Sequence, residues 1–423
     1  TIVEDHVDPN LLFVGTEFGG FFSQDRGESW HALKSNFPTI AVRDLEIQRR
    51  ENDLVVGTFG RGIYVLDDYT ALRTSADDVE PMHLFGVRDA WSYIVGDKIG
   101  YGEKGFRGAD YYNEKNPPFG AVFTYYIEDE IQTAAAERRA AEIETEKAGG
   151  DTPYPSWDAL RAEDREDDPK VMLVVRNEGG EVVRYVEGKT SAGLHRTAWD
   201  LRWPSTDPVN LGGSDFSAPW ASDPQGPLVA PGVYSATLAV QRNGKLEEIG
   251  EAQTFRVKSL LQGNDTSTDL ASVVAFQRKA GELYRAVTGA AALAGELGQR
   301  IEHLKAAIPM TPTASPALAE QLRTIEVSLD DAVVALSGDS TVASRDEPTP
   351  WAVSRRAGAV YGLLLSVRQD VPAMYEQSYD IAATEFNDVL SDLKRINSEL
   401  GALERELEAL GAPHTPGRVP DWP

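Results

Sequence analysis

Apolar residues recur every three or four positions through four stretches near the C-terminal end of the chain. A spacing that alternates between three and four places one apolar seam along each helix. Turns containing Pro and Gly separate the stretches, so the pattern predicts an antiparallel four-helix bundle over 263–412. Thr268 or Asp269 is expected to cap the first helix. The four seams cover residues 276–308, 318–336, 353–367 and 375–410.

Apolar and polar residues alternate between turn residues over 170–258, which is the pattern of β-strands. Hairpin turns are expected at 177–180 and 242–244. About seven short strands with Gly turns predict an Ig-like or fibronectin-like β-sandwich over 73–262, joined by strands at 83–95 and 120–127. Between these strands, residues 128–168 are charged and helix-forming, which predicts a helical insertion.

The first 72 residues contain a repeat. Val14–Thr16 recurs 42 residues later as Val56–Thr58, and Phe21-Phe22 aligns with Ile63-Tyr64. A period near 40 residues, made of short strands and Gly turns, is typical of β-propeller blades. Because a closed propeller has roughly four to eight blades, residues 1–72 are expected to be the two terminal blades of a larger propeller. Residues 413–423 form a C-terminal tail in this division of the chain.

Residues 23–30 read Ser-Gln-Asp-Arg-Gly-Glu-Ser-Trp, which is an Asp-box. An Asp carboxylate can accept N–H bonds within its own tight turn, and Gly supplies a positive φ at little cost. The Trp offers a large apolar face for packing between blades. None of these roles needs a substrate. A structural role is therefore assigned to the box residues Ser23, Asp25, Gly27, Ser29 and Trp30.

The Asp-box and the segment 52–68, NDLVVGTFGRGIYVLDD, resemble the end of bacterial BNR/Asp-box (sortilin-like) β-propeller proteins, often labelled glycosyl hydrolases. The resemblance covers nearly the whole chain, through the segments 116–126, 195–204, 230–238 and 411–422. It implies the C-terminal portion of such a protein, periplasmic or secreted by a bacterium. The hydrolase label comes from sialidases and xyloglucanases that share the Asp-box, so the resemblance implies a fold more than an activity.

The composition of the chain argues against some classes of binding partner. The chain of 423 residues has 67 acidic and 41 basic residues, a net charge of −26, which argues against nucleic acid and anionic membrane surfaces. Without cysteine there is no disulfide and no thiolate metal site. No apolar run approaches the ~18–20 residues of a membrane span. The chain starts at Thr1 within an expected strand, so a processed or truncated N-terminus is expected.

Patterns of catalytic and metal-binding residues are missing from the sequence. The 6 histidines are dispersed, no G-x-S-x-G motif occurs, and the helical seams contain no Glu-x-x-His pair. Glycosidases need two carboxylates at a defined separation across the sugar. In Asp-box enzymes these carboxylates would lie on blades outside this chain. We therefore expect no catalytic residue, no metal and no cofactor here.

The candidate binding residues are aromatic side chains in two stretches rich in Gly, Asn and Pro. They are Tyr111 and Tyr112 in the first stretch, and Trp203 and Trp220 in the second. Exposed aromatic rings on loops stack on sugars or anchor a protein partner. The alternative is that these rings lock loops at the junction between the blades and the sandwich.

Three functions are consistent with these patterns. The favoured one is a non-catalytic, extracytoplasmic interaction or scaffold protein, which docks to a partner protein or a larger assembly through its sandwich and helical bundle. The second is the accessory C-terminal region of an Asp-box propeller glycosidase, with carbohydrate as its ligand. The third is a sortilin-like peptide receptor. Turnover of an aryl glycoside by the chain would exclude the first.

Overall fold

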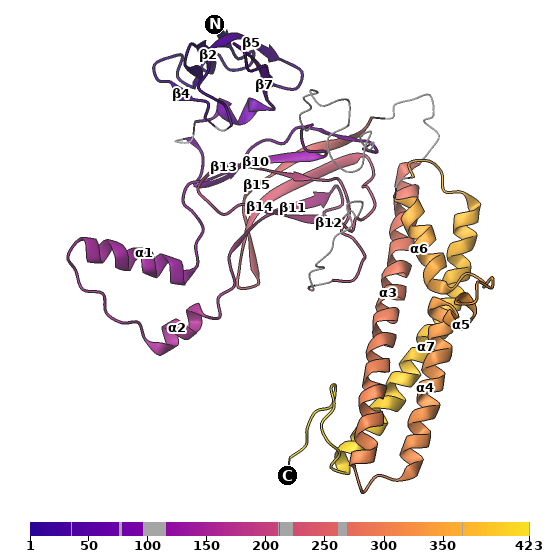
Figure 1. Ribbon diagram of the computed structural model, residues 1–423. Helices are drawn as coiled ribbons and strands as arrows, with labels where there is room; N and C mark the ends of the chain where they lie inside the picture. The colour runs from indigo at the N-terminus through magenta and orange to yellow at the C-terminus, as the bar shows by residue number, and fades with distance from the viewer. Residues whose placement is uncertain are drawn as a thin grey trace. The chain divides into compact units, whose positions relative to one another are not determined.

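The computed structural model describes residues 1–34, 36–75, 78–95, 116–209, 211, 223–260, 269–365 and 367–422. Contacts divide the chain into two compact units (Figure 1). The first, here called the β unit, comprises Thr1–Val95, Arg107–Leu201 and Gly232–Leu260. The second, here called the helical unit, comprises Gly96–Phe106, Arg202–Pro231 and Leu261–Pro423. The expectation of a chain that combines several β-sheets with α-helices is confirmed.

The N-terminal repeat folds into two small antiparallel sheets. The first contains β1 (Ile2–Glu4), β2 (Leu12–Thr16), β3 (Gly19–Ser23) and β4 (His31–Ala32), in that order. The second contains β5 (Val42–Gln48), β6 (Asp53–Thr58) and β7 (Ile63–Leu66), and the 3₁₀-helix η1 (Tyr69–Arg73) follows it. One apolar core contains buried side chains from both sheets, including Phe13 and Leu54. The boundary predicted at residue 72 lies inside the β unit and stays a prediction.

Two further sheets complete the β unit. The strands β13 (Gly193–Trp199), β10 (Ala121–Ile127) and β8 (Met82–Leu84) form a three-stranded sheet. A five-stranded sheet has the order β12 (Val182–Gly188), β11 (Lys170–Asn177), β14 (Gly232–Arg242), β15 (Lys245–Ser259) and β9 (Ala90–Ser92). Buried aromatic rings of the two sheets meet, since Trp199 lies 5.5 Å from Tyr234 and Phe123 lies 5.8 Å from Phe255 between centroids. Both predicted hairpin turns are present.

The single strand expected over 83–95 is wrong, because the chain crosses between sheets there. β8 pairs with β10, whereas β9 pairs in parallel with β15. Asp89, just before β9, accepts a hydrogen bond from the backbone N–H of Arg256 at 2.8 Å and pairs with Lys258 at 2.6 Å. These contacts hold the second half of the segment on the other sheet.

The charged stretch between the strands is helical, as predicted. It contains α1 (Ala134–Lys147) and α2 (Trp157–Glu163), capped by the hydroxyls of Thr133 and Ser156. Neither helix has a buried residue. Arg138 of α1 donates two hydrogen bonds of 2.7 Å to Glu163 of α2, so a surface ion pair joins the two helices.

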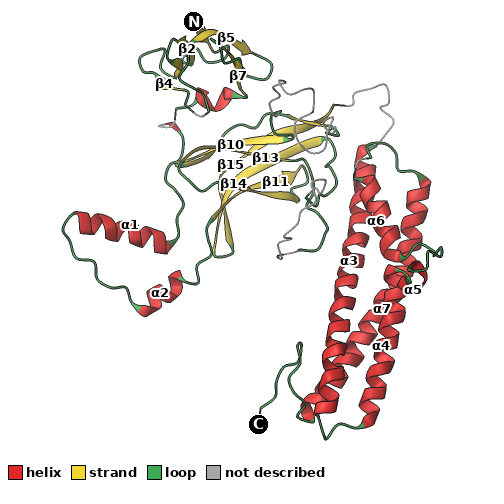
Figure 2. Ribbon diagram, viewed as in Figure 1, coloured by secondary structure: helices red, strands yellow, loops and turns green. Residues whose placement is uncertain are grey.

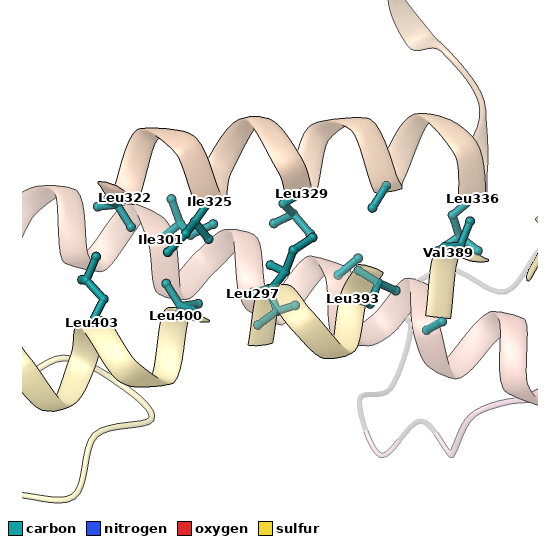
Figure 3. Packing of buried hydrophobic residues seen from close by; sticks show 14 of the residues in the cluster. Leu297, Ile301, Leu322, Ile325, Leu329, Leu336, Val389, Leu393, Leu400 and Leu403 are labelled. Carbon is teal, nitrogen blue, oxygen red and sulfur yellow. The ribbon is translucent and has the colours of Figure 1, made fainter. Parts of the chain in front are cut away.

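The helical unit contains α3 (Leu270–Ala307), η3 (Ile308–Met310), α4 (Pro316–Ser337), α5 (Ser340–Ala343), α6 (Val353–Leu364) and α7 (Ala373–Ala409) (Figure 2). Asp269 caps α3, as one of the two predicted caps. Most residues of the predicted apolar seams lie on the buried faces of these helices. In Figure 3, Leu297 of α3, Leu329 of α4 and Leu393 of α7 meet in the core. The buried residues of α4 are its complete predicted seam, Leu318, Leu322, Ile325, Leu329, Ala332 and Leu336.

The predicted antiparallel four-helix order is not what the structure shows. α3 and α7 run in the same direction, because Phe276 lies 5.8 Å from Tyr379 near their starts and Arg300 pairs with Glu404 near their ends. α6 runs against α3, since its last residue, Leu364, accepts a 2.6 Å hydrogen bond from Gln277. α4 also runs against α3, and its early residues lie beside the end of α3.

α4 and α6 follow one another along the same side of the two long helices. A Cβ built on Gly338, which ends α4, would lie 3.7 Å from the Cβ of Ala352, which precedes α6. The segment between them, which includes α5, therefore leaves and returns at one place without reversing the chain. The periodicity identified which face of each helix is buried, but it carries no information on whether a break reverses the direction.

Candidate functional site

The β unit contains a pocket of about 660 Å³, here called the aromatic pocket. Its lining comes from β3 and the loop after β4, from β7 and η1, and from β10 and β13. A volume of this size is within the range of small-molecule and peptide side-chain sites, roughly 300–1,000 Å³. The apolar walls include Phe22, Leu33, Phe37, Tyr64, Leu72 and Phe85.

The sequence repeat places two of these walls. Phe22 and Tyr64 occupy equivalent positions of the repeat, and both line the pocket. Phe37 packs edge-to-face against Tyr64, with ring centroids 5.0 Å apart. His31 of β4 covers the ring of Phe22 at 5.3 Å. Aromatic pairs of this geometry are favoured beyond their buried area, so the rings support one another around the pocket.

A buried ion pair holds the wall formed by η1. Asp5, in the loop after β1, accepts hydrogen bonds from Arg73 Nε at 2.7 Å and Arg73 Nη2 at 3.0 Å. The Tyr69 hydroxyl donates to the same carboxylate at 2.6 Å, and Arg73 Nη2 also donates to Asn52 at 2.8 Å. Both ends of η1 are thereby tied to the first sheet. Tyr69 and Leu72 of η1 line the pocket.

The ionisation states in this cluster follow from its contacts. Burial alone raises the pKa of Asp5, but the hydrogen bonds from Arg73 and Tyr69 outweigh it and hold the pKa well below its usual range. Burial, together with the hydrogen bond to Asp5, raises the pKa of Tyr69 well above its usual value. At neutral pH the cluster therefore contains a carboxylate, a guanidinium and a neutral phenol, all of them paired.

Most polar groups at the rim of the pocket are occupied. Gln24 donates to the carbonyl oxygens of Leu72 at 2.7 Å and Thr74 at 3.0 Å, which fixes the end of η1. Arg196 of β13 donates to the carbonyl oxygens of Asp67 and Asp68. His195 Nε2 lies 2.6 Å from the carbonyl oxygen of Ser191 and must carry the proton to donate there. These side chains shape the site and are not free to bind.

Lys34 is different. It lines the pocket from the loop after β4, and among the residues that the structure describes its ammonium has no hydrogen-bond or ion-pair partner. The described lining contains no Asp and no Glu. The described lining thus combines apolar aromatic walls with the ammonium of Lys34, which has no partner, and the guanidinium of Arg196, which is bound to backbone carbonyls. Such a site suits an apolar ligand with a carboxylate or another anion at one end.

The Asp-box forms the tight turn expected of it. Ser23 donates to Asp25 at 2.6 Å and accepts from the backbone N–H of Gly27 at 2.7 Å, while Asp25 accepts from the N–H of Ser29 at 2.9 Å. Hydrogen bonds from the Ser23 and Ser29 hydroxyls hold the pKa of Asp25 well below its usual range. All of these hydrogen bonds lie within the box, so these polar groups stabilise the turn.

Trp30 lies against Gly27 of its own turn, and its predicted packing between blades stays a prediction. A Cβ at Gly27 would lie 3.3 Å from Cζ2 of Trp30, so the indole covers its own turn. Gly27 has φ 92° and no side chain, which leaves room for the ring to fold back. The ring is 38% exposed.

Of the four candidate binding aromatics, Tyr111, Tyr112 and Trp220 lie outside the described residues. Trp203 belongs to the helical unit, where the guanidinium of Arg278 in α3 lies 3.7 Å from its ring centroid. Nearby, Asp207 accepts a 3.0 Å hydrogen bond from Tyr284, whose ring stacks on Tyr361. Trp203 therefore helps to fasten residues 202–209 to α3, and both predicted roles for it, ligand binding and the locking of loops at the junction between blades and sandwich, stay predictions.

None of the predicted binding aromatics, which come from stretches rich in Gly, Asn and Pro, is among the described lining of the pocket. The repeat itself held the signal, because Phe22 and Tyr64 share one repeat position. No protein-family model, no curated protein and no solved structure matches the chain. Among the described helices, none is both long enough and apolar enough to cross a membrane.

Proposed function

We propose that this chain is a non-catalytic interaction module, which binds a segment of a protein partner in the aromatic pocket. The observation that carries the proposal is the pairing of aromatic walls with the unpaired ammonium of Lys34 and no acidic residue in the described lining. Aromatic side chains around a pocket provide large contact areas at low entropic cost. The ligand class is an apolar peptide segment that ends in, or carries, a carboxylate.

The proposal also assigns a fold type to the sheets of the β unit. The repeated sheets β1–β4 and β5–β7, with an Asp-box turn after β3, are proposed to be two blades of a BNR/Asp-box β-propeller. The two sheets that meet at Trp199 and Phe255 are proposed to be an Ig-like sandwich. The resemblance that suggests both also suggests a bacterial protein of the periplasm or the exterior. The partner would then be another extracytoplasmic protein or a complex in which this chain is a subunit.

Titration with short peptides tests the function. The probes are N-acetylated pentapeptides that end in Leu or Phe with a free carboxylate, and binding is followed by calorimetry. Phe37→Ala should weaken binding by about tenfold, because a central aromatic contact is lost. Phe18→Ala is the matched control, since Phe18 lies in the β2–β3 turn of the same sheets, outside the pocket lining, and is 77% exposed. Absence of saturable binding, or equal loss in both variants, would contradict the proposal.

A second candidate function is the accessory region of an Asp-box glycosidase. It is favoured by the Asp-box turn itself, whose Ser23–Asp25–Ser29 contacts are complete. In that case the paired carboxylates of a glycosidase would lie outside this chain. A panel of aryl glycosides separates the two. Turnover by the isolated chain would exclude the non-catalytic proposal, whereas peptide binding without turnover supports it. A sortilin-like peptide receptor is a variant of the first proposal and would share its peptide binding.

A further inference from the structure

The helical unit contains a second concave site, which is separate from the aromatic pocket and independent of the function proposed for it. It has a volume of about 750 Å³ and lies between the end of α4, the segment that contains α5, the start of α6, and α7. We call it the acidic groove. Its residues come from one unit, so it is a feature of the helical core and its surface.

The break between α4 and α6 creates this groove. A continuous helix would bury the same apolar seam against α3 and α7 without the intervening segment. Instead, Gly338 ends α4 with φ 99°, and Asp339 caps α5 by accepting hydrogen bonds from the N–H groups of Thr341 and Val342. The segment then returns through Pro348, Pro350 and Trp351. Such an excursion in a compact domain is commonly functional, and here it raises a wall opposite α7.

The groove is strongly acidic. The charged residues of its described lining are Asp331, Asp339, Glu385, Asp388 and Asp392, with Arg395 as the single basic one. Arg395 is already paired with Asp392 and Glu399, at 3.2 Å each. Asp331, Glu385 and Asp388 have no ion-pair or hydrogen-bond partner for their carboxylates within the described part of the chain. Three uncompensated negative charges therefore face one concavity.

The rest of the groove is suited to aliphatic carbon. Ala332, Val353 and Val389 belong to the apolar core and lie at its floor, while Trp351 stands at its wall and is 45% exposed. The guanidinium of Arg355 lies 4.7 Å from the Trp351 ring centroid, which shows that the indole accepts a cation on one face. Lys and Arg side chains combine an apolar stem with a cationic end, which matches this combination of floor and rim.

We propose that the acidic groove binds a basic peptide segment of a partner protein. The stems of its Lys or Arg side chains lie along Val389 and Trp351, and their cationic ends pair with Asp331, Glu385 and Asp388. Charge complementarity favours a basic segment. The unpaired carboxylates would repel an acidic segment and would contribute little binding energy with a neutral one.

The test uses the whole chain and a synthetic octapeptide, N-acetylated and amidated, in which Arg alternates with Leu. Its control ligand contains citrulline in place of Arg, which keeps the shape and removes the charge. Neutralising the groove with Asp331→Asn, Glu385→Gln and Asp388→Asn should weaken binding of the Arg peptide by about tenfold or more at low salt. The citrulline peptide should bind at least about tenfold more weakly to the unmodified chain.

A matched triple variant controls for the overall charge. Glu320→Gln, Asp380→Asn and Glu406→Gln remove the same three charges from exposed positions of α4 and α7 outside the groove lining. This variant should retain the affinity of the unmodified chain to within about twofold. Trp351→Ala provides an independent check and should weaken binding by about threefold or more through the lost stem contact. Circular dichroism confirms that each variant folds.

Three results would overturn the proposal. The citrulline peptide binds as tightly as the Arg peptide, or the two triple variants lose affinity equally, which would indicate attraction to the overall negative charge. Alternatively, the unmodified chain self-associates in sedimentation experiments and neutralising the groove abolishes the association, which would make the occupant a second copy of this chain. Because the groove and the aromatic pocket share no residue, failure here leaves the pentapeptide titration unaffected.

Discussion

Arg73 and Asp5 form a bidentate ion pair between segments 68 residues apart, and the Asp5 side chain is completely buried. The pair connects η1 with the loop after β1. The Tyr69 hydroxyl and the N–H groups of Val7 and Asp8 also donate to the carboxylate, and Nδ1 of His6 lies 3.3 Å from it. Both oxygens of the buried carboxylate accept hydrogen bonds from described residues, which is the condition under which such a pair is tolerated. The wall of the aromatic pocket depends on it.

Asp5→Asn should destabilise the β unit by about 2–4 kcal/mol, because Arg73 loses its buried counterion while remaining charged. Hydrogen exchange read by mass spectrometry measures this loss for η1 and β1 separately from the helical unit. Glu51→Gln is the control, since it disrupts the more exposed contacts with Arg50 and Arg88, and exposed pairs contribute about 0–1 kcal/mol each. Equal effects of the two substitutions would show that the buried pair is not the tie we describe.

The same pair predicts the direction of a pH dependence. The pKa of Asp5 in the folded chain lies below its usual value of 3.8, so the unfolded chain binds the proton more readily in acid. Stabilisation by this carboxylate is therefore present above about pH 4 and is lost as the pH falls further. The difference in unfolding free energy between the unmodified chain and Asp5→Asn should be present at about pH 5 and shrink below about pH 4. A difference that persists unchanged at about pH 3 would contradict this assignment.

Leu400 lies in α7 with no exposed surface, in the core shared by α3, α4 and α7 (Figure 3). Leu400→Ala should destabilise the helical unit by about 2–5 kcal/mol, through the lost burial and the cavity that remains. Leu363→Ala is the control, since Leu363 on α6 is 58% exposed. Urea unfolding followed by far-ultraviolet circular dichroism compares the two. Similar midpoints would show that the predicted seam is not the core.

Ser23 is the buried residue of the Asp-box. Ser23→Ala removes the acceptor for the Gly27 N–H and one donor to Asp25, and it should destabilise the turn by about 1–2 kcal/mol. Faster hydrogen exchange should be confined to residues 23–32. Ser29→Ala, at an exposed position of the same turn, should have the smaller effect. A larger effect of Ser29→Ala would mean that Asp25, not Ser23, organises the box.

In the helical region, the periodicity of apolar residues predicts the buried faces of the helices but not all of their directions. The seam of α4 was predicted residue by residue, because burial of one face imposes the period on the sequence. The directions of α6 and α7 were not, because the segment after Gly338 leads into α6 along the same side of the long helices without reversing the chain. A Gly at a helix end predicts a stop, and the path of the chain afterwards depends on the tertiary packing that here returns Ala352 to the neighbourhood of Gly338.

The candidate sites were harder to predict, for two reasons. Asp5 and Arg73 are too distant in sequence for a local pattern to pair them, and in a chain with 67 acidic residues any basic residue has many nominal partners. The Asp-box was predictable because its contacts span only residues 23 to 29. Phe22 and Tyr64 could have been predicted as pocket residues from the repeat. Lys34 could not, because it becomes a candidate ligand-binding residue only when the fold places it beside those rings.

The coupling between Lys34 and the ligand carboxylate tests the binding proposal most directly. Dissociation constants are measured for one pentapeptide with a free C-terminal carboxylate and for its amide, against the unmodified chain and Lys34→Gln. We predict that amidation weakens binding to the unmodified chain by about tenfold and leaves binding to Lys34→Gln nearly unchanged, as expected for a charge pair in a partly enclosed site. If amidation lowered the affinity equally in both proteins, Lys34 would not bind the carboxylate. That result would contradict the assignment of the aromatic pocket as the peptide-binding site.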